Sequence, residues 1–409
     1  MCLKFSEGSC IEEGDLPLAL FKKLAPSLSH TEFLVLNGIG EPLLHPDLDE
    51  MIAIARAAMP TDARIGFQSN GLLLNQPRAV RLIEAGLDTI CLSLDSLDAD
   101  EAKEHNQGGH QLSAVTKAIA HLLQAREVAQ RHVRIGIEVV LQKQTLPQLH
   151  DLIAWADEHC VDFIIASHLF SYDGSLTDQS LFNPNSYEAT RLFAKWSAEA
   201  KAQGVNLEKL SAAQLKFCKS SADTLLVQLG AAMRQEAKEE NLSLHFPNLV
   251  AQSSRDMEEV EINFHKAQWS ASKRGIDLFL PPLYAYVDGQ RRCPFIDDDA
   301  VFIDKNGKVM PCHFLWHTCP SQVNHSAIQV EKRVLGSVKE ESLESIWQNK
   351  AYTAFRTEAE QSEYAPCWSC TSSPCNDLIN DNLLDMNDCY GSHVPCGHCM
   401  WSIGWLKCL

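Results

Sequence analysis

FLVLNGIGEPLLHP, residues 33–46, joins a short apolar run to a loop that contains two glycines, a glutamate and a proline. The apolar run predicts a strand, and the glycines predict a turn after it. Glycine lets the backbone approach a ligand closely, and Glu41 offers a carboxylate to an ammonium group. Apolar residues then recur at the spacing of one helix face from Leu48 to Ala55. The stretch therefore predicts a strand, a candidate binding loop and a helix.

The same order of strand, polar loop and amphipathic helix repeats further along the chain. Apolar runs predict strands at 65–68, 89–94, 135–141 and 163–166. Gly86 follows one of the helical stripes, where a helix-ending glycine is expected. Such alternation implies parallel strands joined by right-handed crossovers, with ligands at the carboxyl ends of the strands. The candidate loops are 38–41, 69–71, 93–96 and 167–168. A barrel and an open doubly wound sheet both satisfy the pattern.

Composition limits the size, partners and location of the protein. With 409 residues, 45% of them hydrophobic, the chain is long enough for about two or three domains. Its 53 acidic and 35 basic residues give a net charge of −18, and such a surface repels a phosphate backbone. The start has no signal segment, and no apolar run of roughly eighteen residues offers a membrane span. We therefore expect a cytoplasmic protein whose main partner is neither nucleic acid nor membrane.

Ten of the fifteen cysteines lie in the last 117 residues of the sequence. In a reduced cytosol, clustered thiols are metal ligands far more often than disulfides. Apolar runs on both sides of Gly307 predict a hairpin, which would bring Cys293 and Cys312 near one another. The candidate metal ligands of this region are Cys293, Cys312, Cys319, Cys367, Cys370, Cys375, Cys389, Cys396 and Cys399.

The loops of the first half resemble those of the radical S-adenosylmethionine (radical SAM) superfamily. GxGEPLLHP, SNG and CLSLDS follow or end successive strands in the family's order, across residues 15–175. The resemblance implies an α/β fold, a partial (βα)6 barrel, that binds S-adenosylmethionine (SAM) at these loops. It assigns SAM binding to Gly38, Gly40, Glu41, Pro42, Ser69, Asn70, Ser93 and Asp95. Serine and aspartate after a strand are also ordinary helix caps, which is the alternative for Ser93 and Asp95.

The core cluster of that family is bound by CxxxCxxC, which precedes the glycine loop. Here Cys2 has the place of the third cysteine, with 35 residues between it and Gly38. Cys10 does not complete the motif, because seven residues separate it from Cys2. We therefore expect a sequence truncated at its N-terminus, lacking the first strand and two cluster cysteines, and inactive as given.

The cysteine-rich end resembles the SPASM extension of radical SAM enzymes, which carries one or two auxiliary [4Fe–4S] clusters held by thiolates. The fit is imperfect, because the usual string has a further cysteine where this chain has Ile379. A structural zinc site is the alternative, since two CxxC pairs are also what a four-cysteine site needs. His313 and His317 follow Cys312 closely and could join a metal.

The chain is thus predicted to have three parts. These are a radical SAM barrel without its first strand at 1–204, a mainly helical connecting region at 205–290, and a SPASM-like auxiliary cluster domain at 291–409. Within the connecting region, the run at 276–280 is predicted as a strand entering a linker. Cys160 and Cys218 are isolated, and we expect them to be buried packing thiols.

The activity implied by the resemblance is reductive cleavage of SAM to a 5′-deoxyadenosyl radical that abstracts a substrate hydrogen. The extension favours a peptide or protein substrate, including a metalloenzyme under maturation, with an electron donor such as flavodoxin or ferredoxin. Cofactor-precursor biosynthesis of the molybdopterin-cyclase type is a second interpretation. A third is a non-catalytic zinc-binding module on a degenerate barrel. No side chain is assigned a catalytic role beyond cofactor binding.

Overall fold

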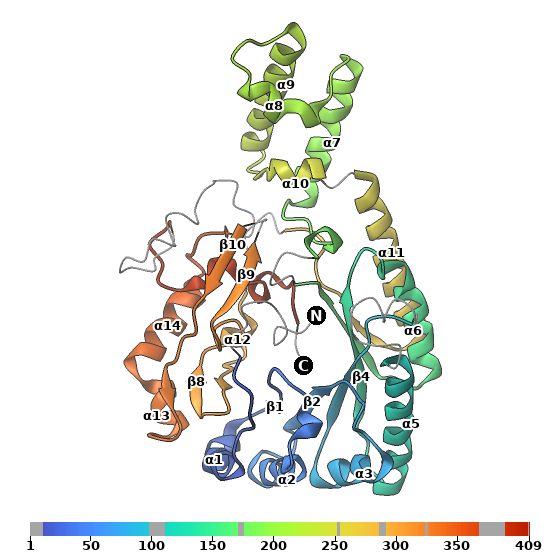
Figure 1. Ribbon diagram of the computed structural model, residues 1–409, viewed down its shortest axis with the longest axis vertical. Coiled ribbons are helices and arrows are strands. Elements are labelled where there is room, and N and C mark those ends of the chain that lie inside the picture. Colours follow the sequence, from blue (N-terminus) through green and yellow to red (C-terminus); the bar gives the residue numbers. More distant parts are fainter. Residues whose placement is uncertain are drawn as a thin grey trace.

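The computed structural model of the protein describes residues 11–97, 111–170, 176–251, 254–285, 292–323, 326–367, 389–407 and 409. Its main element is a six-stranded parallel sheet whose strand order follows the chain (Figure 1). The strands are β1 (Phe33–Val35), β2 (Arg64–Ser69), β3 (Thr89–Ser93), β4 (Arg134–Leu141), β5 (Phe163–His168) and β6 (Asp277–Phe279). The five strands predicted from the first half of the sequence are confirmed.

The strand order decides between the two architectures that the sequence left open. An open doubly wound sheet reverses its order at a switch point, whereas the order here runs from β1 to β6 without reversal. Right-handed crossovers then place the connecting helices on one face, and the sheet curves as a partial barrel (Figure 1). These helices are α2 (Leu48–Ala58), α3 (Gln76–Ala85), α5 (Gln111–Ala129), α6 (Leu149–Glu158) and α11 (Ser254–Arg274). Gly86 ends α3 at a φ of 124°, as predicted.

Paired charges gather at the amino ends of the strands. The carboxylate of Asp88 accepts hydrogen bonds from the Arg131 guanidinium at 2.6 Å and from the Ile65 amide at 2.8 Å. Asp162 pairs in the same way with Arg126 at 2.5 Å. Because these groups neutralise one another, this edge of the barrel serves stability, and the ligand site is expected at the opposite edge.

Gly136 in β4 has no room for a side chain. A Cβ atom there would lie 2.2 Å from two carbons of the buried Phe163 ring. Replacing Gly136 by alanine should therefore displace the ring and lower the free energy of unfolding by about 1–3 kcal/mol. Urea unfolding measures this change, with Gly40→Ala as the control, because no heavy atom lies within 4 Å of a Cβ at Gly40. Equal unfolding midpoints for the two variants would contradict the packing.

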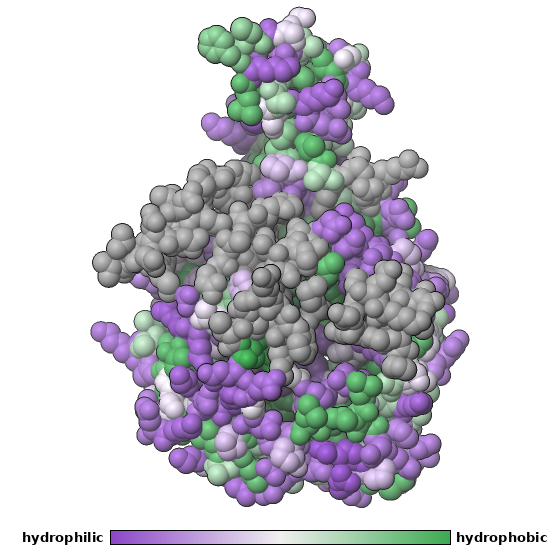
Figure 2. Space-filling model, in the orientation of Figure 1, coloured by the Kyte–Doolittle hydropathy of each residue, from purple (hydrophilic) through white to green (hydrophobic). Residues whose placement is uncertain are grey.

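Residues 187–251 form a helical arm that stands away from the barrel (Figure 1). The arm contains α7 (Tyr187–Ala202), η6 (Leu207–Lys209), α8 (Leu210–Leu215), α9 (Ser221–Glu239) and α10 (Phe246–Ala251), which share a separate apolar cluster. The side chains of Leu215 and Phe217 are 88% and 102% exposed, and apolar surface gathers at the end of the arm in Figure 2. After the arm, α11 returns to β6, so the strand predicted at 276–280 is confirmed, and it pairs with β5 to complete the barrel sheet.

The cysteine-rich part lies beside the start of the chain (Figure 1). The predicted hairpin is confirmed: β7 (Phe302–Ile303) and β8 (Lys308–Met310) are antiparallel and turn at Gly307, where φ is 74°. The hairpin and the chain after it join the barrel core, since Val309 of β8 and Val338 belong to the same apolar cluster as Leu20. The division of the chain into three parts itself stays a prediction.

Short elements complete the structure. In the barrel they are α1 (Leu18–Leu24), η2 (Ala25–His30), η3 (Pro42–Leu44), η4 (Leu146–Gln148) and η5 (Thr177–Gln179). In the cysteine-rich part they are α12 (Pro294–Asp297), β9 (Cys319–Val323), β10 (Ser326–Val330), β11 (Gly336–Ser337), α13 (Leu343–Gln348), α14 (Lys350–Gln361), η8 (Pro395–His398) and η9 (Trp401–Ile403). Over the described residues, no helix has both the length and the apolar character needed to span a bilayer.

Candidate functional site

The carboxylate of Glu41 holds the first two candidate loops together. One of its oxygens accepts hydrogen bonds from the Ser69 hydroxyl at 2.7 Å and from the Leu43 amide at 3.1 Å. The other oxygen accepts from the Asn70 amide at 2.9 Å. Parallel strands end at the same edge of the sheet, which explains why loops 28 residues apart in the chain meet. Glu41 therefore joins the two loops of the site. Its predicted contact with an ammonium group stays a prediction.

Three polar side chains inside the barrel form a chain that the sequence analysis missed. Asn37 and Gln68 exchange two hydrogen bonds, from the Asn37 amide nitrogen at 3.0 Å and from the Gln68 backbone at 2.8 Å. The Gln68 side chain then donates to Glu138 at 2.7 Å. A signal was present in the sequence, because Glu138 interrupts the apolar strand 135–141 with a charge.

Asp95, predicted from the third loop, faces this polar chain. One of its oxygens accepts a hydrogen bond from the Val140 amide at 3.2 Å. Burial raises the pKa of Glu138 to about 7, and the charge of Asp95 adds to the effect, whereas the Gln68 hydrogen bond opposes it. The carbonyl oxygen of Ser93, the other predicted residue of this loop, accepts a hydrogen bond from Gln111 at 3.0 Å. All three predicted loops thus contribute to one edge of the barrel.

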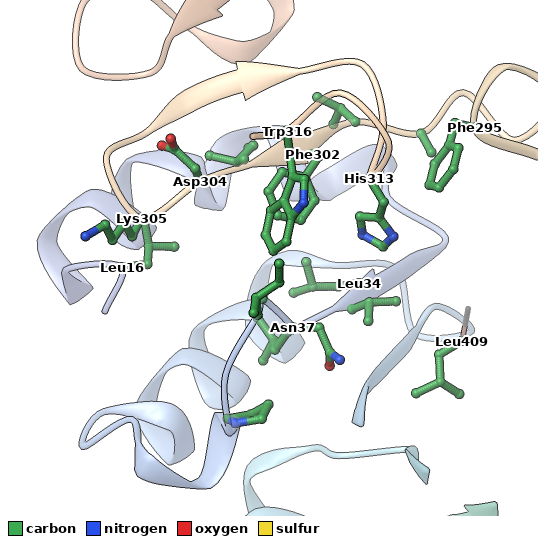
Figure 3. Close-up of a pocket in the computed structure, with 18 of the residues that line it drawn as sticks. Leu16, Leu34, Asn37, Phe295, Phe302, Asp304, Lys305, His313, Trp316 and Leu409 are labelled. Carbon is green, nitrogen blue, oxygen red and sulfur yellow. The ribbon is translucent and has the colours of Figure 1, made fainter. Parts of the chain in front are cut away.

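A cavity of about 2160 Å³ adjoins this edge. One of its walls is the loop 37–41, and the cysteine-rich part supplies another, from which Phe302, His313 and Trp316 face Leu34 and Asn37 (Figure 3). The Trp316 ring lies 4.0 Å from the position that a Cβ on Gly38 would occupy. The predicted SAM loop and the predicted metal-binding part therefore share one cavity.

Residues 401–407 and Leu409 lie beside β5, and most of them line the cavity. The His168 amide donates to the Trp405 carbonyl at 3.1 Å, and the Ser167 hydroxyl contacts the backbone of Lys407 at 3.3 Å. Leu409 packs against the cluster of Cys91, Phe163 and Ile165. Burial lowers the pKa of His168 to about 4, although its ring contacts the Pro282 carbonyl at 2.7 Å. The predicted loop 167–168 therefore holds this segment through the His168 backbone amide and the Ser167 hydroxyl. The His168 imidazole is neutral at pH 7.

Four thiols come together between the hairpin and the last residues. They belong to Cys293, Cys312, Cys396 and Cys399, and every pair of them is coupled electrostatically. Burial raises the pKa of all four above the usual value, and for Cys312, Cys396 and Cys399 the neighbouring thiols add to the rise. We call this set the thiol tetrad. The predicted approach of Cys293 to Cys312 is part of it.

The other candidate ligands are not part of the tetrad. Burial alone raises the pKa of Cys319 to about 11, with no thiol among its causes. The sulfur of Cys367 lies 2.9 Å from the position of a Cβ on Gly397, which places it against the Cys396–Cys399 turn. Cys389 is exposed. The remaining predicted ligands lie outside the described residues, namely Cys2, Cys370 and Cys375.

The thiol tetrad supplies four thiols, the number that a [4Fe–4S] cluster or a structural zinc ion takes. In a [4Fe–4S] cluster each thiolate binds a different iron, so the sulfurs stand farther apart than around one tetrahedral ion. Within the described ranges, no three or more Cys, His, Asp or Glu side chains form a site for a single ion. Buried thiols that raise one another's pKa need a strongly cationic group to become thiolates.

Two histidines that the sequence offered as possible ligands pack among aromatic rings. The ring centroid of His313 lies 5.1 Å from that of Phe302, and His317 lies 4.9 Å from Trp316. Burial lowers the pKa of both imidazoles to about 4, and the charge of Lys332 contributes at His317. Both rings are therefore neutral at pH 7.

The expectation that Cys160 and Cys218 are buried packing thiols was wrong, because both are exposed. Cys160 lies in the turn after α6 with a φ of 56°, and Cys218 lies in the loop at the end of the arm. Cys91 in β3 is a buried packing thiol and is fully enclosed. A cysteine in a turn does not lie on the apolar face of a helix or strand, so other residues do not bury it.

Comparisons with known proteins agree with this arrangement. Residues 21–156 match the family model of the radical SAM superfamily, and residues 293–371 match that of SPASM, an iron–sulfur cluster-binding domain. The tungsten-containing aldehyde ferredoxin oxidoreductase cofactor-modifying protein of Pyrococcus furiosus is 25% identical over 97% of this chain and 90% of its own length. GTP 3′,8-cyclase of Chlorobaculum tepidum is 39% identical over 84 residues, 20% of this chain and 24% of that protein.

Among solved structures, Streptococcus suis SuiB bound to S-adenosylmethionine matches with a TM-score of 0.48 and 12% identity, over 91% of this chain and 69% of that one. The two family models cover the barrel strands β1 to β4 and the cysteine-rich hairpin. The chain therefore contains a radical SAM domain and a SPASM domain, which imply SAM and [4Fe–4S] clusters as its cofactors.

Proposed function

We propose that the protein is a radical SAM enzyme that modifies an organic cofactor, or the protein that carries it, during the maturation of a metalloenzyme. The observation that carries this proposal is the shared cavity. The loop 37–41 and the cysteine-rich part line the same space, so SAM at the loop would lie beside a substrate bound against that part. The Pyrococcus furiosus relative, which is named as a cofactor-modifying protein, aligns with nearly the whole chain and supports this substrate class.

The residues proposed to hold SAM are those of the three loops. Glycines Gly38 and Gly40 leave the backbone open to the ligand, and Glu41 fixes Ser69 and Asn70 at its side. Pro42, Ser93 and Asp95 complete the set. When bound beside a reduced cluster, SAM supplies a 5′-deoxyadenosyl radical. The chain's own task is to orient the substrate and keep water out of the cavity.

The thiol tetrad is proposed to hold one auxiliary cluster. Cys367, with Cys370, Cys375 and Cys389, remains a candidate set for a second one. Cys319 is left out of both sets because its thiol is coupled to no other. Cys2 is proposed as one ligand of the core cluster. An external donor such as flavodoxin or ferredoxin would supply the electron.

Metal analysis and product analysis test this proposal together. The protein produced with the coding sequence upstream of Met1 and reconstituted anaerobically should contain iron and sulfide, and should release 5′-deoxyadenosine from SAM when a reductant is added. With a cofactor extracted from a tungsten or molybdenum enzyme, we expect a SAM-dependent mass change in the cofactor or in its carrier protein. Stoichiometric zinc without sulfide would instead identify a structural zinc module.

A second candidate substrate is a purine nucleotide that serves as a cofactor precursor. The 39% identity to a GTP 3′,8-cyclase over 84 residues favours it. The net charge of −18 opposes it, because an acidic protein repels a triphosphate. The same assay with GTP in place of the extracted cofactor separates the two substrates.

A further inference from the structure

The polar chain Asn37–Gln68–Glu138 connects the interior of the barrel to the wall of the cavity. Asn37 lines the cavity directly before Gly38, whereas Gln68 and Glu138 do not line it. The polar chain therefore begins at a partly buried carboxylate and ends at the loop proposed to hold SAM.

The sheet is built so that these side chains can meet across a strand. Gln68 in β2 pairs in register with Cys91 in β3, and Cys91 pairs with Gly136 in β4. Glu138 lies two residues beyond Gly136, opposite Ser93. Because Cys91 is small, the Gln68 side chain can pass over β3 and reach Glu138 at 2.7 Å.

The direction of each hydrogen bond follows from Glu138. A carboxylate only accepts, so the Gln68 amide must turn its nitrogen toward Glu138. Its oxygen then faces Asn37 and accepts from the Asn37 nitrogen at 3.0 Å. The Asn37 oxygen is left to accept from the Gln68 backbone at 2.8 Å. One carboxylate therefore sets the orientation of two amides, and a hydrogen bond to a charged acceptor is stronger than a neutral one.

We propose that Glu138 is a positioning residue for SAM binding, acting through Gln68 and Asn37 to fix the loop 38–41. This inference rests on the proposed SAM site. Its effect is indirect, because the carboxylate reaches the loop only through two amides. It also places a negative charge behind a loop that would receive a cationic ligand.

The charges that face Glu138 make the effect depend on pH. Asp95 and Cys91 are the titratable groups beside Glu138. The charge of Asp95 raises the pKa of Glu138, and the charge of Glu138 in turn raises the pKa of Cys91. Within the described part of the chain, Glu138 forms no ion pair. Because the pKa of Glu138 is raised to about 7, the carboxylate ionises as pH passes through that value. SAM carries a net positive charge, so its affinity should rise with pH over the same range.

Equilibrium binding of SAM to the anaerobically reconstituted protein tests the inference without turnover. We expect Glu138→Ala to weaken SAM binding about tenfold at pH 8, because the Gln68 amide loses its charged acceptor. Glu138→Gln still offers an acceptor oxygen, and it should retain more affinity while losing the rise with pH. Glu158→Gln, an exposed glutamate at the end of α6, is the matched control and should bind as the wild type does.

A double-mutant cycle separates positioning from a merely structural role. Asn37→Ala and Glu138→Ala remove the two ends of the polar chain, which are joined only through Gln68. Their effects on SAM affinity should therefore add up to less than the sum of the two single effects. Iron and sulfide content should stay unchanged in every variant. Glu138→Gln should also melt at a higher temperature than the wild type at pH 8 but not at pH 4. The native state binds the Glu138 proton more tightly than the unfolded state, so ionisation costs stability as pH rises.

The outcomes distinguish this inference from the proposed function. If the wild type binds SAM and Glu138→Ala binds it equally well with the same pH profile, the positioning role is wrong. Additive effects of the two single variants would also exclude it. If the wild-type protein itself does not bind SAM, the proposed function fails, whatever the variants do.

Discussion

Replacing Cys312 by alanine is expected to remove about four iron atoms and about four sulfides per chain from the reconstituted protein. Cys312 is buried and coupled to all three other thiols of the tetrad. Without Cys312, one iron of the buried [4Fe–4S] cluster has no thiolate ligand. We expect the whole cluster to be lost as a result. Iron and sulfide assays, together with the visible absorbance of the cluster, measure the loss.

Cys319→Ala is the control for this prediction. Cys319 is as buried as Cys312 and lies in the same part of the chain, but no other thiol affects its pKa. The variant should therefore keep the iron of the parent protein. Loss of iron from Cys319→Ala and not from Cys312→Ala would mean that the tetrad is the wrong ligand set. Stoichiometric zinc lost from Cys312→Ala would instead support the zinc interpretation.

Replacing Glu41 by glutamine is expected to weaken SAM binding by at least about 100-fold. The two carboxylate oxygens of Glu41 accept hydrogen bonds from three donors, which come from Leu43, Ser69 and Asn70. Glutamine has the same shape but carries an NH2 group in place of one oxygen. That group would point at a donor, so at least one hydrogen bond becomes a repulsion and the two loops separate. Calorimetric titration with SAM under anaerobic conditions measures the effect.

Glu50→Gln provides the matched control for Glu41→Gln. Glu50 lies in the first turn of α2 and pairs with Lys22 at 2.8 Å, with both side chains about half exposed. Exposed pairs contribute little to stability, so this variant should bind SAM normally. Wild-type affinity in Glu41→Gln would show that the brace between the loops is not needed for SAM binding.

Much of the barrel could be predicted from local patterns. Apolar runs gave the strands up to β5, and Gly86 and Gly307 marked a helix end and a hairpin turn that the structure confirms. These features depend on neighbours in the chain, such as the φ that glycine tolerates or the spacing of one helix face. The choice of loops for the site also followed, because parallel strands carry ligands at their carboxyl ends.

The roles of individual side chains in the site could not be read in the same way. Glu41 was expected to face a ligand, and the structure uses both of its oxygens to join two loops. Glu138 was visible only as a charge within an apolar strand. Its contact with Gln68 spans 70 residues and crosses β3, where Cys91 pairs in register with Gln68. Such contacts arise from the register of a sheet, which no local pattern encodes.

The sequence by itself determined the strand and helix pattern of the barrel, the candidate loops and the cysteine-rich hairpin, because each rests on residues close together in the chain. Only the tertiary structure decided which thiols meet. Cys293 lies at the start of α12 and Cys312 just after β8, whereas Cys396 and Cys399 come from a turn far along the chain. Exposure of Cys160 and Cys218 was decided in the same way. Burial and long-range contact depend on which surfaces pack together, and that is a property of the folded chain as a whole.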